Sequence, residues 1–250
     1  MIFPSAQEKF LSFIFQPDCF VCGDRLSVSA ESSSHKVRIC DLCHDSVTDG
    51  LAQRCSFCGV ILKQPSPFGE RCAQCRAWKS KLAKIYSVGN YSGLLRSTIV
   101  DIKRDFLDIK AFQLGLLMGE QFELMSDCEE IDAVIPVPSH WRRRWSRRGF
   151  QPSNVIADGF CKATGLRKLS NTLRCVKFVK KQSKMGTNQR INNVQKSFAI
   201  RRDSRLQDLR VLLIDDVITS GATANECAKL LSSARVSAVY AAVAARAAGG

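Results

Sequence analysis

Apolar residues recur from residue 81 onward with the periods of strands and helices in turn. Short apolar or β-branched runs predict strands, and apolar residues three and four positions apart predict helices. The predicted strands cover residues 83–86, 131–137, 173–179, 197–200, 211–214 and 236–244, and the predicted helices cover residues 92–104, 109–125, 153–164 and 221–234. Strands that alternate with helices favour an α/β fold with a parallel sheet and right-handed crossovers. Residues 246–250 are expected to form a frayed end.

The first 80 residues show no such period. Polar or proline-containing loops separate four Cys-x-x-Cys pairs, and few residues remain to form a conventional core. We therefore predict a small domain over residues 1–80 and an α/β domain over residues 81–250. Residues 1–16 are mildly apolar but contain Glu8 and Lys9 and no cleavage site. We expect a short helix there rather than a signal peptide, and a cytoplasmic protein without a membrane span.

The composition is that of an ordinary globular chain apart from its cysteines and its charge. The 250 residues are 45% hydrophobic and 24% charged, so a sizeable core can be buried. Twelve cysteines in a chain without a secretion signal favour metal binding over disulfides. The net charge of +14 is uneven, because residues 141–205 hold 18 Lys and Arg and only two acidic residues. Such a block favours a polyanionic or phosphate-rich partner, and a solvated basic surface is the alternative.

Eight of the cysteines form pairs that suit a tetrahedral metal ion, because one Cys-x-x-Cys turn supplies two thiolates. The four pairs are Cys19 and Cys22, Cys40 and Cys43, Cys55 and Cys58, and Cys72 and Cys75. We expect two structural zinc ions with four thiolates each, and iron–sulfur or redox use is the alternative. Gly23 and Gly59 follow the first and third pairs, where a tight turn needs a permissive backbone. This repeat favours sequential pairing of the four units, and crossed pairing of the first with the third stays open.

An apolar strand, two adjacent acids, a hydroxyl-rich loop and a helix follow one another near the carboxyl terminus. The residues are Val211-Leu-Leu-Ile-Asp215-Asp216-Val-Ile-Thr219-Ser220-Gly221-Ala222-Thr223. Ligands of open α/β sheets bind at the carboxyl ends of strands, and a helix amino terminus offers unpaired N–H groups to a phosphate. Adjacent acids suit sugar hydroxyls, from which they accept hydrogen bonds. The segment therefore predicts a sugar phosphate site; the alternative is a capped helix beside a chance acid pair.

This segment resembles, along its whole length, the phosphoribosyl pyrophosphate (PRPP) signature of type I phosphoribosyltransferases. The resemblance implies that Asp215 and Asp216 hold the ribose 2′- and 3′-hydroxyls. The residues implied for the 5′-phosphate are Thr219, Ser220, Gly221, Ala222 and Thr223. Magnesium is expected with PRPP, held by the diphosphate rather than by a protein cage. Purine-salvage members carry an aspartate in place of Thr219, so simple purine salvage is disfavoured.

A second strand-to-loop junction is rich in arginine and tryptophan. Pro136-Val-Pro138 is followed shortly by Trp141-Arg-Arg-Arg-Trp-Ser-Arg-Arg148. Arginines clamp diphosphate oxygens in pairs, so Arg148 is assigned to PRPP. Arginine interleaved with tryptophan suits single-stranded nucleic acid, whose bases stack on aromatic rings; a solvated loop with two partly buried tryptophans is the alternative. The residues assigned to nucleic acid are Arg142, Arg143, Arg144, Trp145 and Arg147.

The motifs of the whole chain follow one another in a specific order. They are the four Cys-x-x-Cys pairs, Tyr91-Ser-Gly-Leu-Leu-Arg with Lys103, Pro136-Val-Pro138, Arg148-Gly-Phe150, Gln182, Arg190-x-x-Asn193-Val194-x-x-x-Phe198 and the PRPP signature. In that order they resemble the ComF family of competence proteins over nearly all of the chain. The family has Arg-Gly-Phe-Asn-Gln where this chain has Arg148-Gly-Phe-Gln151-Pro152. Residues 181–198 would correspond to a mobile hood over the site.

The ComF resemblance implies a type I phosphoribosyltransferase-like fold behind a double zinc ribbon. It implies a role in natural transformation, in handling incoming single-stranded DNA alongside other DNA-uptake proteins. It does not imply a transferase activity with the same force, because a PRPP site can catalyse transfer or only sense its ligand. Two hypotheses follow: a PRPP-binding competence factor that handles single-stranded DNA, and an active phosphoribosyltransferase for an unknown small nucleophile. A purely regulatory binder is less favoured, because no helix-turn-helix is visible.

Overall fold

The computed structural model describes residues 17–26, 37–48, 54–62, 71–72, 75, 80–125, 130–139, 149–176, 196–201 and 205–247. Its elements alternate between strands and helices, as the apolar periods predict. They are α2 (Asp41–Thr48), β1 (Ile85–Asn90), α4 (Gly93–Asp105), α5 (Asp108–Met125), β2 (Ala133–Pro136), α7 (Pro152–Thr164), β3 (Leu173–Cys175), β4 (Phe198–Ile200), β5 (Arg210–Ile218), α9 (Ala222–Ser233) and β6 (Ala238–Arg246). Within these ranges, no helix combines the length and the hydropathy that crossing a membrane requires.

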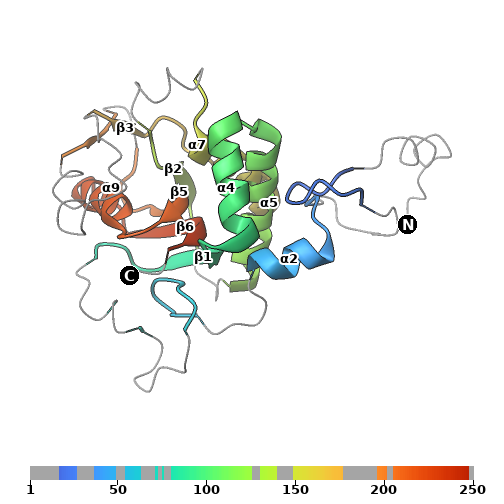
Figure 1. Cartoon of the computed structure of the whole chain (residues 1–250). Helices are drawn as coiled ribbons and strands as arrows, with labels where there is room; N and C mark the ends of the chain where they lie inside the picture. Colours follow the sequence, from blue (N-terminus) through green and yellow to red (C-terminus); the bar gives the residue numbers. More distant parts are fainter. Residues whose placement is uncertain are drawn as a thin grey trace, which may run out of the picture.

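Four parallel strands form the central sheet, in the order β1-β6-β5-β2 (Figure 1). The two short strands β3 and β4 pair with each other in antiparallel fashion, outside this sheet. The predicted α/β fold with a parallel sheet is therefore confirmed. The sheet brings the carboxyl ends of all four strands to one edge, which is where open α/β sheets bind ligands.

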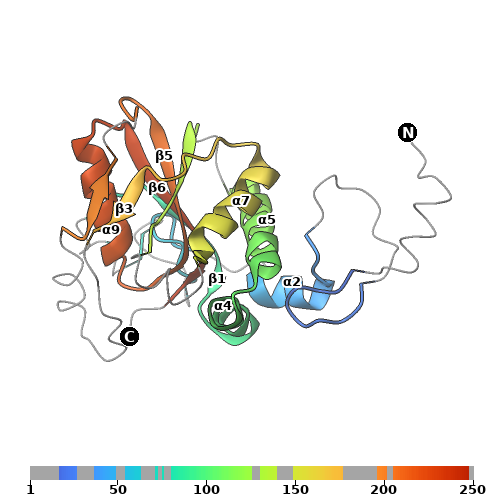
Figure 2. The same ribbon diagram turned by 90° about the horizontal axis from the view of Figure 1, so that it is seen from above.

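Helices cover both faces of the sheet, and alternate side chains of β5 pack against the helices on each face. Leu212 and Ile214 join one core with α4, α5 and α7, whereas Val211 and Leu213 join a second core with α9. Figure 2 shows the sheet between these two layers. Because side chains of a strand alternate between faces, a strand buried on both faces is apolar throughout. This explains the uninterrupted apolar run before the two acids.

The close packing of α5 against α7 fixes the position of α7. A Cβ added at Gly115 would overlap the carbonyl oxygen of Ile156, and one added at Gly159 would overlap that of Phe112. Neither position has room for a side chain, so the two backbones approach each other at glycine on both helices. The contact places the amino terminus of α7 beside the carboxyl end of β2.

The amino-terminal segments pack on the edge strand β1 rather than standing apart. The guanidinium of Arg54 donates to the carbonyl oxygens of Ser87 (3.1 Å) and Val88 (2.7 Å). The amide of Ile85 donates to the carbonyl oxygen of Phe57 at 2.6 Å. These bonds satisfy groups that an edge strand otherwise leaves open to pairing with another chain. The cysteine-rich region thus protects the sheet edge.

The two cysteine-rich segments join different cores. Phe20 and Val47 belong to the core of α4, α5 and α7, while Phe57 belongs to the core of α9. In Figure 1, α2 lies beside α5, and the segment that follows it lies beside β1. Division of the chain at residue 80 stays a prediction, since both cores extend across that position.

Several boundaries differ from the sequence predictions. β5 does not end before the acids but continues to Ile218, because β6 keeps pairing with it through Arg246. The expected frayed end is wrong at Arg246, which is buried in β6. β3 ends at Cys175 and Val176 follows it outside the strand, while residues 177–179, like the helix predicted over residues 1–16, lie outside the described residues.

Candidate functional site

The predicted acids lie at the step where β5 loses one of its two neighbours. β2 pairs with β5 only up to Ile214, whereas β6 continues beside it. Beyond Ile214, Asp215 and Asp216 therefore border the space that β2 leaves, and both are half-buried. Because consecutive strand residues face opposite sides, Asp216 lies on the side of α4 and Asp215 on the side of α9. The amide of Asp216 donates to Oδ1 of Asp215 at 2.9 Å.

A lysine from α4 forms an ion pair with the second acid. Nζ of Lys103 lies 2.7 Å from Oδ2 of Asp216, and the two side chains are only 22% and 14% exposed. A pair this shielded is screened less by salt than a surface pair. Lys103 thus compensates the charge of Asp216 and fixes the direction of its carboxylate.

Asp215 has a different electrostatic environment. Its pKa is raised to about 8, first by burial and then by the neighbouring charge of Asp216, while Lys103 and the amide of Asp216 oppose the shift. At neutral pH Asp215 therefore carries a proton for most of the time. With Lys103 included, the acid pair carries little net charge, which reduces its repulsion of a phosphorylated ligand.

The loop after β5 turns at a glycine and leads directly into α9. Gly221 is buried and has φ 73°, a left-handed conformation that favours glycine. The amide of Asn225 donates to the carbonyl oxygen of Gly221 at 2.9 Å, which is the first bond of the helix. The amides of the first helical turn therefore have no partner inside α9. Thr219 is exposed, and Ser220, Ala222 and Thr223 are half-buried.

The structure brings the predicted acids and loop residues to one edge of the sheet but leaves the basic residues undescribed. Asp215 through Thr223 lie consecutively around the carboxyl end of β5. The assigned residues that lie outside the described part of the chain are Arg142, Arg143, Arg144, Trp145, Arg147 and Arg148. Their assignments stay predictions.

The segment that follows those arginines is anchored beside the acids. The amide of Val137 donates to the carbonyl oxygen of Ile214 at 2.9 Å. The carbonyl oxygen of Val137 in turn accepts hydrogen bonds from Nε2 of Gln151 (3.3 Å) and Oγ of Ser153 (2.6 Å). The amino terminus of α7 is therefore held at the carboxyl ends of β2 and β5. Gln151, where the family has asparagine, serves this anchor.

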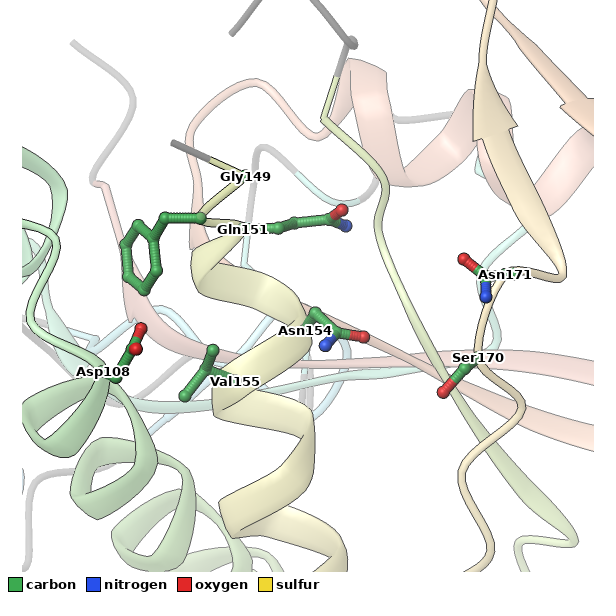
Figure 3. A pocket seen from close by; sticks show the side chains of 8 residues that line it. Asp108, Gly149, Gln151, Asn154, Val155, Ser170 and Asn171 are labelled. Atoms are coloured by element: carbon green, nitrogen blue, oxygen red, sulfur yellow. The ribbon is translucent and has the colours of Figure 1, made fainter. Parts of the chain in front are cut away.

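A polar pocket of about 530 Å³ lies at this end of α7 (Figure 3). In the figure, Gln151 and Asn154 extend from α7 toward the segment of Ser170 and Asn171. The residues that line it are Asp108, Gly149, Phe150, Gln151, Asn154, Val155, Ser170 and Asn171. The pocket contains neither acid of β5, so it is a neighbour of the acid site and not the same cavity.

The cysteines form two groups of four. One group is Cys19, Cys22, Cys40 and Cys43, and the other is Cys55, Cys58, Cys72 and Cys75. Within each group the possible ligand atoms all lie within 4.8 Å of one another. This is the sequential arrangement that the repeated glycine favoured, not the crossed one. Both glycines have the left-handed backbone that the turn requires, with φ 85° at Gly23 and 68° at Gly59.

The distances between sulfurs fit a tetrahedral metal. A zinc ion with bonds of about 2.3 Å to four thiolates separates the sulfurs by about 3.8 Å. The Sγ atoms of Cys22 and Cys40 are 3.9 Å apart, and those of Cys58 and Cys72 are 3.7 Å apart. A hydrogen bond from Cys75 lowers the pKa of Cys58 to about 5, so a thiolate is available at neutral pH. Both groups can hold a metal ion, and their geometry is consistent with zinc.

The sequence motifs include Lys103, but they predict no role for it in the site. Lys103 follows Ile99 by one helical turn and Leu95 by two, so it extends the apolar stripe of α4. A cation on a core-facing stripe is the signal that was available. Its partner Asp216 was not predictable, because the two residues meet only when α4 packs across β5.

Known proteins are similar to this chain in sequence and in fold. Residues 146–250 match the phosphoribosyl transferase domain family. The chain is 26% identical over 181 residues to Competence protein F of Haemophilus influenzae, covering 71% of this chain and 77% of that protein. It is 26% identical over 216 residues to DNA utilization protein YhgH of Salmonella typhimurium, covering 85% and 89%. A crystal structure of adenine phosphoribosyltransferase matches with a TM-score of 0.35 and 16% identity over 60% of this chain and 75% of that one.

We predict two zinc ions per chain, to be measured by elemental analysis of the purified protein. The double variants Cys19→Ser/Cys22→Ser and Cys55→Ser/Cys58→Ser should each lose one equivalent. The second should lower Tm more, because its four cysteines are all buried whereas Cys22 is exposed. Cys161→Ser, outside both groups, is the control and should keep both ions. Iron in place of zinc, or one ion in the unmodified protein, would contradict the assignment.

Proposed function

We propose, on the premise that this chain is a ComF-type protein with a phosphoribosyl transferase domain, that it binds PRPP and handles single-stranded DNA during natural transformation. The observation that carries the PRPP part is the combination of two half-buried acids with a glycine turn and a helix amino terminus at one strand end. The names of the similar proteins, Competence protein F and DNA utilization protein YhgH, support the DNA part.

In the proposed complex, the ribose lies over the carboxyl end of β5. The carboxylate of Asp216, which pairs with Lys103, accepts hydrogen bonds from ribose hydroxyls, while Asp215 supplies either a proton or a lone pair to the same sugar. The 5′-phosphate meets the amides and hydroxyls of the loop from Thr219 to Thr223, with the positive end of α9 behind it. Arg148 and a magnesium ion neutralise the diphosphate. The ion pair with Lys103 holds the carboxylate of Asp216 in place for the sugar.

We expect isothermal titration with magnesium and PRPP to show binding that depends on these charged groups. Asp215→Asn and Asp216→Asn should each weaken binding by roughly ten- to a hundredfold, the range of a lost hydrogen bond to a charged group. Lys103→Met should also weaken binding of PRPP, because the carboxylate of Asp216 then loses its ion-pair partner. Arg104→Met and Asp101→Asn, at the exposed side of α4, are the matched controls. Equal affinity in all five variants would remove PRPP from the proposal.

Binding of single-stranded DNA is assigned to the arginine- and tryptophan-rich segment. Replacement of Arg142, Arg143, Arg144 and Arg147 by alanine should weaken binding and flatten its salt dependence, by about 0.7 in the log–log slope for each phosphate that is no longer neutralised. Trp145→Ala should cost about 1–3 kcal/mol through lost stacking. Fluorescence anisotropy of a labelled oligonucleotide at several salt concentrations measures both. An affinity that changes neither with salt nor in these variants would show that another part of the chain binds DNA.

An active phosphoribosyltransferase for an unknown small nucleophile is the second candidate function. The polar pocket of Gln151, Asn154 and Asn171 favours it, because an acceptor held there would lie next to the proposed diphosphate site. Release of pyrophosphate from PRPP, measured over a panel of bases and amines, tests this function. With an accepted nucleophile, Asn154→Ala and Asn171→Ala should raise the KM for that nucleophile and leave PRPP affinity unchanged. Without release across the panel, PRPP acts as an effector.

A further inference from the structure

Arg246 was expected to belong to a frayed end, but it lies at the edge of the sheet where the carboxyl ends of the strands meet. It is the last residue of β6, whose neighbours in the sheet are β1 and β5. Its carbonyl oxygen accepts from the amide of Tyr91 at 3.0 Å, and the next amide, of Ala247, donates to Ile218 at 2.9 Å. The side chain is 6% exposed. The residue is therefore enclosed on both sides at the carboxyl end of the sheet.

The guanidinium of Arg246 contacts the backbone at the start of the phosphate loop. Nη1 donates to the carbonyl oxygens of Ile218 (3.0 Å) and Ala247 (3.2 Å), and also to that of Thr219. Nε is buried and has no hydrogen-bond partner among the described residues. In the described part of the chain, the carboxylates engaged in ion pairs all pair with other cations. Within these residues, the charge of Arg246 is therefore held by carbonyl dipoles.

These contacts determine the direction of the loop amides. A trans peptide unit is planar, and its C=O and N–H point in opposite directions. Because the carbonyls of Ile218 and Thr219 turn toward Arg246, the amides of Thr219 and Ser220 turn away from it. The first turn of α9 adds amides that have no partner inside the helix at the other end of the loop. Arg246 thus organises the part of the loop that the helix does not reach.

A buried cation without a counter-ion is costly for the folded chain, and an anion nearby reduces that cost. Arg246 is such a cation, and it lies at the start of the phosphate loop. The loop residues themselves offer only neutral hydrogen-bond donors. The arrangement resembles an anion site that the protein prepares before the ligand arrives.

We propose that Arg246 is the positioning residue of the phosphate loop: it orients the Thr219 and Ser220 amides and supplies the positive charge that selects a sugar phosphate's dianionic group. The inference rests on the proposed function in one respect only, that the ligand carries a ribose. The anion itself is a phosphate monoester, and inorganic phosphate is its simplest form.

The test compares ribose 5-phosphate with inorganic phosphate on the full chain with its metal ions. Arg246→Lys keeps the charge but loses the planar donors, so we expect about a tenfold loss of affinity for both ligands. Arg246→Met should lose more. The ratio of the two affinities, which reports the sugar, should stay as in the unmodified protein. Asp216→Asn should reduce the ratio, because it removes a hydrogen-bond acceptor from the sugar and leaves the phosphate loop intact. Titration calorimetry and thermal-shift titration measure the two ligands.

The matched control is Arg210→Met, at the opposite end of β5, which should leave both affinities unchanged. A merely structural role of Arg246 would reduce the ratio together with the phosphate affinity, and that result overturns the inference. Unchanged phosphate affinity in Arg246→Lys and Arg246→Met also overturns it, as does an unmodified protein that binds neither ligand. Phosphate binding that depends on Arg246, in a protein that does not bind PRPP, would sustain this inference while the proposed function fails.

Discussion

β5 is paired differently on its two sides, and the arrangement of the site follows from that difference. On one side β2 leaves after Ile214, and on the other β6 stays through Arg246. The backbone of Asp215 and Asp216 is therefore paired with β6 on one side and has no strand partner among the described residues on the other. A strand held in this way presents one acid to each face of the sheet, and each face supplies a different environment.

The electrostatics of the site come from groups far apart in the chain. Lys103 from α4 compensates Asp216, burial beside α9 keeps a proton on Asp215, and Arg246 from the last strand faces the loop carbonyls. The acids are thus nearly neutralised before any ligand binds, while beside the loop lies a cation that pairs with no carboxylate of the described residues. This division separates a region suited to hydroxyls from a region suited to phosphate at the end of a single strand.

The four-cysteine groups stabilise the frame that carries this site. The second group is buried in the core of α9, and Arg54, from the same segment, covers the carbonyls of β1. The first packs through Phe20 and Val47 against the layer of α4 and α5, the layer that holds Lys103. Four thiolates fill a tetrahedral shell and leave no position for a substrate. A metal ion bound there would therefore act on stability and on the position of the helices.

The sequence alone determined those features of the protein that depend only on residues close together in the chain. Cys-x-x-Cys spacing predicts metal ligands from one turn, Gly23 and Gly59 predict tight turns after two of the pairs, and the apolar run before Asp215 predicts a buried parallel strand, because each is a local property of the chain. Tertiary structure alone decided that Lys103 meets Asp216, that Arg246 is buried against Ile218 and Thr219, and that β5 continues past its acids. These depend on how helices and strands pack across long sequence separations, and no local pattern records which distant groups will share a low-dielectric space.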